Sequence, residues 1–251
     1  MNISKFITVC FLICTIPSLI LAQKNDYLKW NLKGKIKSIK ETTYTVKSDK
    51  ITKDSIEFYY INEFNNYGNK IVDTKFLPSG KTDKNYKYKF DNNNRRIEEN
   101  QYGAGEKLIR TIVYKYDTNG NLIEDSSVGG DGKPEKTIKY TYDDKEKVSE
   151  DNSFDSEGKL LKKFTYKYDL KNNKVENCKY SADEQLERKN TYIYDANNNV
   201  IEESSYKADN SLNKKINYSY EYDSQNNWIK KTIKIDNETV NIIERQIEYF
   251  K

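Results

Sequence analysis

A pair formed by an aromatic residue and a following Asp or Asn returns at a fixed interval along this chain. The first five steps between these pairs are 26 residues each, and the sixth is 28. The pairs are Phe64-Asn65, Phe90-Asp91, Tyr116-Asp117, Tyr142-Asp143, Tyr168-Asp169, Tyr194-Asp195 and Tyr222-Asp223. A constant interval of this length indicates one small structural unit stacked on copies of itself. The repeat constrains the architecture, but it does not specify an activity.

Each interval is long enough for two β-strands and two turns. In the copy that spans 160–184, residues 160–168 alternate between apolar and polar side chains, the pattern of a half-buried strand. Residues 169–172 break this alternation, and a shorter returning strand is expected over 175–180. Residues 181–184 then turn the chain again.

The turn residues support the same hairpin. In the segment 117–121, the Asp117 carboxylate can accept backbone N–H groups, while Asn119 and Gly120 tolerate positive φ. This composition predicts a type I turn closed by a bulge. Asn takes the glycine position in 195–199 and 223–227. The opposite turns have their own signature, in which Asp comes a few residues before Gly or Leu, as in 155–160.

Alignment of the units by this interval gives ladders of apolar side chains. The three ladders are Tyr86, Ile112, Ile138, Phe164, Asn190 and Tyr218; Tyr88, Tyr114, Tyr140, Tyr166, Tyr192 and Tyr220; and Ile71, Ile97, Ile123, Val175, Ile201 and Ile229. Strands joined in order by tight turns form an antiparallel meander. We therefore expect an all-β fold, an antiparallel β-meander of repeated hairpins that forms a long, twisted and curled sheet. This sheet is expected to be open, a half-barrel or solenoid-like.

The chain divides into three expected parts. Residues 1–22 have a short region with Lys5, an apolar run and a small residue at the end, which is typical of a secretory signal peptide. Residues 23–63 are expected to form capping strands, with 35–46 paired against 50–61. Residues 64–251 contain the hairpin repeats, and 242–250 are expected to close the sheet.

The signal peptide predicts an extracytoplasmic protein, periplasmic or secreted after cleavage. The apolar run is short and is followed directly by polar residues, so we expect no stable membrane insertion after signal cleavage. Cys10 and Cys14 lie inside the run without a lipoprotein processing pattern. Their removal leaves Cys178 as the single cysteine, which excludes an intramolecular disulfide in the mature chain.

Catalytic constellations are scarce, and we predict that the protein is not an enzyme and needs no cofactor. The chain has no histidine, so the commonest general base and metal ligand is absent. Paired acids such as Glu98-Glu99 and Glu202-Glu203 are a candidate glycosidase feature, but neighbours on a strand face opposite ways. Cys178 is interpreted as a small packed side chain, because no base can activate it.

Calcium is the nearest candidate for a metal. Asp117, Asn119 and Asn121, with Glu124 nearby, offer oxygen ligands, but the glycine and glutamate spacing of the common calcium loop is missing. A hairpin turn explains the same residues without an ion, so no metal site is predicted.

The charges do not favour nucleic acid as a partner. The chain has 43 basic and 39 acidic residues, whose signs alternate without blocks. Tyr and Lys alternate in segments such as 86–89, but adjacent strand residues point to opposite faces. They would not form a joint surface for stacking bases and binding phosphates.

The segments 114–121 and 192–199 resemble the YD repeat of the Rhs family, with Tyr-x-Tyr-Asp-x-x-Gly/Asn-Asn. The resemblance covers about residues 64–249, and it implies a β-shell like the one that encloses an effector in Rhs toxins. Unlike that family, this chain is expected to carry no effector domain after the repeats, and its units are expected to be too few for a closed shell. Residues 30–41 resemble the start of short exported repeat proteins of the Bacteroidetes. The half-unit also resembles MORN repeats more weakly.

Three functions follow as expectations. The first is an exported, non-catalytic binding or scaffold module of the cell envelope, whose curved sheet contacts a glycan or an envelope protein through aromatic rows. The alternative, implied by the Rhs resemblance, is a stand-alone shell relative that serves as an immunity or carrier component of a toxin system. The third is an envelope hydrolase with an unrecognised carboxylate site. The residues that would contact the ligand are unknown at this level.

Overall fold

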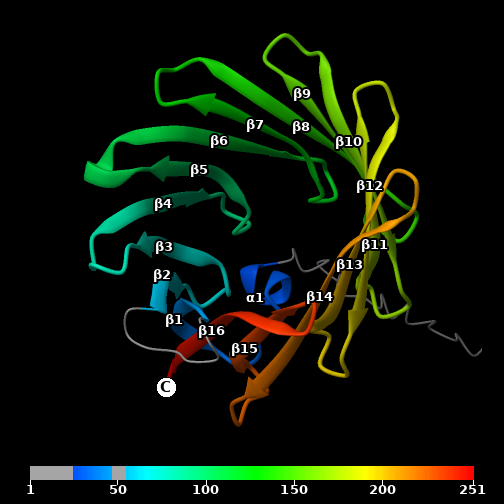
Figure 1. Cartoon of the computed structure of the whole chain (residues 1–251). Coiled ribbons are helices and arrows are strands. Elements are labelled where there is room, and N and C mark those ends of the chain that lie inside the picture. The colour runs from blue at the N-terminus through cyan, green and yellow to red at the C-terminus, as the bar shows by residue number, and fades with distance from the viewer. Residues whose placement is uncertain (1–24, 47–54) are drawn as a thin grey trace, which may run out of the picture.

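The structure is a computed structural model that describes residues 25–46 and 55–251 (Figure 1). The predicted signal peptide, 1–22, lies outside the described residues. A short helix α1 (Asp26–Lys29) precedes the strands, and a 3₁₀ turn η2 (Ala104–Glu106) interrupts them. In the described ranges, no helix has the length and apolar character needed to cross a membrane.

The strands follow one another with short connections. They are β1 (Ile36–Thr45), β2 (Ile56–Phe64), β3 (Lys70–Phe76), β4 (Thr82–Phe90), β5 (Arg96–Tyr102), β6 (Leu108–Tyr116), β7 (Leu122–Gly129), β8 (Pro134–Tyr142), β9 (Val148–Asp155), β10 (Leu160–Tyr168), β11 (Lys174–Ser181), β12 (Leu186–Tyr194), β13 (Val200–Lys207), β14 (Leu212–Tyr222), β15 (Trp228–Ile235) and β16 (Glu238–Tyr249). The all-β prediction is confirmed.

The sheet is a closed antiparallel barrel, so the predicted open, half-barrel or solenoid-like sheet is wrong. Each strand pairs with the next, and β1 also pairs with β16 in a register that runs from Ser38↔Glu248 to Thr45↔Asn241. Strand β1, which lies in the segment expected to cap the sheet, pairs with β2 on one side and with β16 on the other. Closure leaves no edge strand among the described strands, whereas an open sheet always has two.

The predicted turns form one rim of the barrel. Asp117 Oδ1 accepts the N–H groups of Asn119 at 2.9 Å and Asn121 at 2.8 Å. Gly120 has a φ of 88° in this turn. Asn198 takes the equivalent position in a later turn with a φ of 61°. These aromatic-Asp turns connect β4 to β5, β6 to β7, and so on, and we call this end of the barrel the YD rim.

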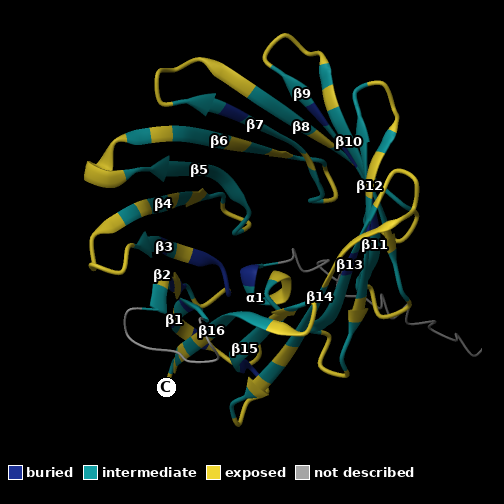
Figure 2. Ribbon diagram, in the orientation of Figure 1, coloured by how far each residue is buried: buried dark blue, intermediate teal, exposed yellow. Residues whose placement is uncertain are grey.

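The two faces of the barrel wall differ in chemistry. The outer face carries cross-strand ion pairs that repeat with the units: Lys89 with Glu98 at 2.7 Å, Lys115 with Glu124 at 2.6 Å, and Lys167 with Glu176 at 2.7 Å. The inner face carries the tyrosine ladders and is contacted by α1, which lies inside the ring of strands (Figure 1). Most strand residues are half-buried (teal in Figure 2), as expected for a wall with two accessible sides.

A buried apolar cluster lies where the amino-terminal segment meets the closing strands. Leu32, Ile36, Ile39 and Phe64 are buried there, and Tyr27, Trp30, Ile247 and Tyr249 pack against them. Residues from β1, β2 and β16 contribute to this cluster together with the segment 27–32. Hydrophobic burial is therefore concentrated at the seam that closes the barrel.

Candidate binding surface on the inner wall

A row of tyrosine hydroxyls is bonded to side-chain oxygens across the inner wall. Each hydroxyl donates to an acid or amide that lies 15 residues earlier, on the preceding hairpin. The pairs are Tyr88 with Asp73, Tyr114 with Glu99, Tyr140 with Asp125, Tyr166 with Asp151, Tyr192 with Asn177, and Tyr218 with Glu203. We call these residues the tyrosine–carboxylate row. It crosses the inner wall from β3 to β14 and joins consecutive hairpins.

Burial shifts the ionisation of both partners in this row. Desolvation by burial raises the pKa of the Asp125 and Asp151 carboxyls, while the hydrogen bonds from Tyr140 and Tyr166 act in the opposite direction. Burial and these carboxylates together raise the pKa of the Tyr140 and Tyr166 phenols. The phenols therefore stay protonated and act as donors, and the acid oxygens are the acceptors.

A second row explains why the repeat carries its Tyr-Asp pair. Consecutive hairpins part from one another near the YD rim, where the ladder between β11 and β12 ends at Glu176↔Thr191. In this gap the Tyr194 hydroxyl donates to the backbone carbonyl of Lys174 at 2.8 Å. The same bond joins Tyr116 to Arg96, Tyr142 to Leu122, Tyr168 to Val148, and Tyr220 to Val200. The tyrosine thus satisfies a carbonyl that the sheet leaves free.

The last of these bonds corrects the alignment of the predicted ladders. The interval of 28 residues placed Tyr220 with Tyr192 and Tyr218 with Asn190. In the structure Tyr218 occupies the position of Tyr192, because it bonds Glu203 15 residues earlier. Ile216 occupies the position of Asn190, since it pairs with Glu203 as Asn190 pairs with Asn177. The two extra residues extend β14 at its YD rim end.

The amino-terminal segment crosses the barrel at the YD rim. Asp26 of α1 is 5% exposed and accepts the backbone N–H of Lys70 at 2.7 Å. It also bonds Nη2 of Arg96 at 2.9 Å, and the Arg96 guanidinium stacks over the Tyr88 ring at 4.0 Å. The pKa of Arg96 is raised by the Asp26 charge against the opposing effect of burial. Helix α1 is therefore anchored to β3 and β5.

The far side of the same segment reaches the opposite wall. Asn31 Nδ2 donates to the carbonyl of Asn197 at 2.6 Å, in the turn between β12 and β13. The Asn227 side chain accepts a hydrogen bond from the Lys33 N–H and donates one to the Lys33 carbonyl, each at 2.8 Å. Residues 26–33 thus connect β3 and β5, early in the repeats, with the turns that contain Asn197 and Asn227, late in the repeats. They cover part of the barrel mouth at the YD rim.

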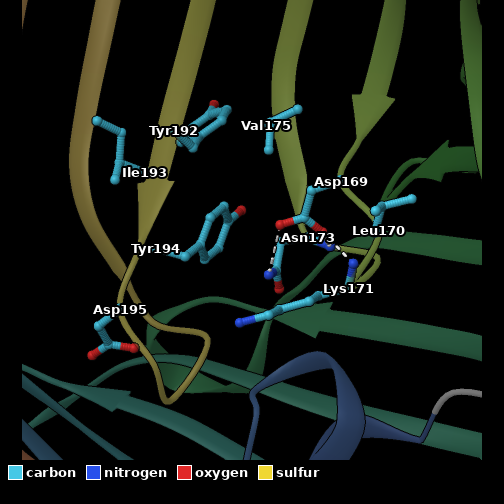
Figure 3. Close-up of a pocket in the computed structure, with 9 residues that line it drawn as sticks. All are labelled: Asp169, Leu170, Lys171, Asn173, Val175, Tyr192, Ile193, Tyr194 and Asp195. Carbon is cyan, nitrogen blue, oxygen red and sulfur yellow. Dashed lines mark hydrogen bonds between the residues drawn. The ribbon is translucent and has the colours of Figure 1, made fainter.

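An open recess of about 440 Å³ lies in one of the gaps between hairpins (Figure 3). Tyr194 points toward the turn 169–173 and Tyr192 lies beside it toward Val175, whereas Ile193 points away from both rings. Leu170 at its margin is 98% exposed and Ile193 is 52% exposed. The recess combines tyrosine rings with exposed aliphatic groups.

The structure separates the acid pairs that were weighed as catalytic candidates. Glu98 faces outward and pairs with Lys89, whereas Glu99 faces inward and accepts the Tyr114 hydroxyl at 3.1 Å. Glu202 pairs with Lys215 at 2.7 Å, and Glu203 belongs to the tyrosine–carboxylate row. The members of each pair therefore point to opposite faces, as the strand periodicity predicts.

The residues weighed for calcium and for a reactive thiol have other contacts. Asp117 is used by its own turn, where Asn121 Nδ2 also donates to it at 3.1 Å. Glu124 points to the outer face and pairs with Lys115. Cys178 is free and 8% exposed on β11. Sequence reasoning missed Asp26 and Arg96, whose partnership links segments that the repeat pattern does not connect.

Comparisons with known proteins give no family assignment. No protein-family model and no curated protein matches the chain. Among solved structures, it is similar to a Photorhabdus luminescens Tc holotoxin pore, with 13% identity and a TM-score of 0.34 over 81% of this chain and 11% of that chain. It is also similar to porin-like proteins from Bacteroides uniformis and Bacteroides vulgatus. The first has 10% identity, a TM-score of 0.40, and covers 85% of this chain and 96% of that chain. The second has 11% identity, a TM-score of 0.41, and covers 83% and 97%. Likenesses this weak carry no functional argument.

Proposed function

We propose that this chain is an exported, non-catalytic binding protein of the cell envelope, whose inner wall holds a glycan. The observation that carries the proposal is the tyrosine–carboxylate row. It presents half-buried rings beside acid or amide oxygens at every second strand from β4 to β14. Aromatic rings pack against the apolar faces of sugars, and carboxylates accept hydrogen bonds from hydroxyl groups.

The sequence repeat places equivalent groups at regular intervals along this surface. Tyr140 and Tyr166 lie two strands apart and make the same bond to Asp125 and Asp151. Equivalent groups in neighbouring units therefore stand about 10 Å apart along the wall. A ligand with its own repeating structure meets the same chemistry in each unit. This arrangement favours a linear polymer over a single small molecule.

The chemistry of the outer face favours an aqueous environment around the barrel. Repeated ion pairs such as Lys89 with Glu98 stand at positions where a lipid-facing barrel carries an apolar band. The signal-like segment 1–22 supports export. We therefore place the protein in the periplasm or outside the cell, without stable insertion into the membrane.

A glycan array tests this proposal with protein produced from the full chain and recovered after export. Tyr166→Ala and Tyr192→Ala remove inner-wall rings, and Tyr180→Ala removes a ring from the outer face as the matched control. We expect binding by the wild type and the control, and a loss of binding in the two inner variants. Circular dichroism establishes that all variants are folded. The proposal is contradicted if the protein binds an envelope protein but no glycan, or if it cleaves the polymer that it binds.

A further inference from the structure

A row of basic residues lies on the inner wall, nearer to the rim opposite the YD rim. It contains one residue from every second strand, always 26 residues after the previous one: Lys84, Arg110, Lys136, Lys162, Arg188 and Lys214. The cross-strand partners confirm the equivalence of these positions, as in Lys84↔Lys75, Lys136↔Ser127 and Lys214↔Ser205. We call these six residues the basic row.

The strand periodicity places this row on the inner face. Lys136 precedes Ile138 by two residues and Tyr140 by four on β8, so all three point to the same side. The tyrosine–carboxylate row is on that side. The amino-terminal segment lies at the other mouth of the barrel, where it bonds Arg96 and Asn197. The basic row is thus not covered by this segment.

Most of these cations form no ion pair within the described residues. Arg110 pairs with Glu135 at 2.5 Å, and the other five make no ion pair with any residue that the structure describes. This contrasts with the outer face, where lysines such as Lys115 and Lys167 are paired. Unpaired charges of one sign along a concave wall produce a concentrated field that attracts an ion of opposite sign.

A recess of about 220 Å³ holds two members of the row. It lies between β12, β13 and β14 and is lined by Arg188 and Lys214, together with Asn190 and Glu203. The Asn190 side chain is 8% exposed, and its Oδ1 atom has no hydrogen-bond partner among the described residues. Ser153, directly across from Lys162, is 1% exposed and its Oγ atom is likewise unpartnered there. Buried polar atoms without partners are uncommon and mark places where a ligand or water completes the bonding.

We infer that the basic row, with the recess at Arg188 and Lys214, binds the anionic groups of an acidic polysaccharide. The inference rests on the proposed glycan function and narrows it to polymers that carry carboxylate or sulfate groups. Equivalent cations stand about 10 Å apart along the wall, since each unit contributes two strands. A chain with regularly placed anions therefore meets one cation in each unit.

The neighbouring row distinguishes such a glycan from nucleic acid. Asp125 faces Ile138, two residues along β8 from Lys136, and Asp151 faces Phe164, two residues along β10 from Lys162. The acid positions are therefore offset from the cation positions by about 7 Å along each strand. Hydroxyl groups of a sugar can donate to these oxygens, whereas a dense line of phosphates would be repelled by them. A ligand with both hydroxyl groups and anions fits the two rows together.

The test measures binding of four labelled polymers to the full exported protein by fluorescence anisotropy. The probes are oligogalacturonate, dextran sulfate, neutral dextran and a single-stranded oligothymidylate. The inner variant combines Lys136→Gln, Lys162→Gln and Arg188→Gln. The control variant combines Lys87→Gln, Lys115→Gln and Lys139→Gln on the outer face, so both lose three positive charges. We expect the inner variant to bind an acidic polymer about tenfold more weakly or worse, with binding by the control unchanged.

The outcomes separate this inference from the proposed function. Binding of neutral dextran as tight as that of the acidic polymers, with no effect of the inner variant, overturns the inference and leaves glycan binding in place. Tighter binding of oligothymidylate than of either acidic glycan overturns the ligand class. An equal loss in both variants shows that net charge, and not the basic row, is responsible. Failure of the wild type to bind any glycan overturns the proposed function itself.

Discussion

The Tyr194 hydroxyl bonds the backbone carbonyl of Lys174 across a gap between two hairpins, at 2.8 Å. The ladder between these strands has already ended, so this carbonyl has no partner within the sheet. We predict that Tyr194→Phe lowers the free energy of unfolding by about 0.5–1.5 kcal/mol, the usual contribution of one hydrogen bond. Urea unfolding of the two proteins measures this difference.

Tyr180→Phe is the matched control for that experiment. Tyr180 lies on β11 with Lys163 over its ring at 5.2 Å, and its register partner is Lys163. The hydroxyl is not part of either inner row, so its removal should change stability less than Tyr194→Phe does. Equal effects of the two substitutions would show that the bond to Lys174 has no special weight.

Asp26 should be the main anchor of the amino-terminal segment. Asp26→Ala removes the acceptor for Lys70 N–H and leaves Glu99, at 3.4 Å, as the remaining ion-pair partner of Arg96. We predict a loss of about 3 kcal/mol in unfolding free energy, because a mostly buried cation loses its nearest counter-charge. Calorimetry and limited proteolysis of the segment 25–35 report the change. Asp26→Asn keeps an acceptor oxygen, so it should lose less unfolding free energy than Asp26→Ala. An equal loss in the two variants would show that the charge of Asp26 alone is responsible.

Closure of the barrel can be tested across the seam between β1 and β16. Thr42 and Glu244 are direct partners in that register, and their side chains face outward. In a Cys178→Ser background, Thr42→Cys with Glu244→Cys should form a disulfide on mild oxidation. Mass spectrometry of unreduced peptides detects the bond. If only intermolecular bonds form, the barrel is not closed at this seam.

High pH should destabilise the barrel through its tyrosines. Burial is the main cause that raises the pKa of Tyr116 and Tyr194 to about 12, whereas an unfolded chain has phenol pKa values of about 10. The folded state holds these protons more tightly, so stability is full below pH ~10 and falls as pH rises from there toward 12. Urea midpoints measured at neutral pH and at about pH 11 check this trend. Phenolate absorbance of the native protein should rise late, together with unfolding.

The repeat made the hairpins and turns predictable, because both depend on local chemistry. The Asp117 carboxylate and the positive φ of Gly120 follow from residues within one turn. Closure depends instead on whether the first and last strands meet after the twist of every intervening strand has accumulated. No single unit records that sum, so the pairing of Ser38 with Glu248 was not predictable from the interval.

The candidate site was partly hidden for a related reason. Lys136 and Lys162 are separated along the chain by residues of both signs, and the sequence therefore appears charge-balanced. The barrel sorts these residues by face and brings equivalent positions into one row. In the alignment of the repeats, the cations form a column two residues before the ladder that starts with Tyr86. The contact between Asp26 and Arg96, by contrast, joins a segment outside the repeat to one inside it and leaves no periodic signal.

The seam between β1 and β16 also governs how the molecule must be made. Lys37 and Glu248 bond at 2.8 Å although they are 211 residues apart. Contacts of such long range form slowly, since the whole intervening chain must be ordered first. During synthesis, β1 emerges early and keeps one side without its partner until β16 arrives. The folding protein thus passes through a stage with an unpaired strand edge, and a factor that holds the chain apart from other chains would be of most use at that stage.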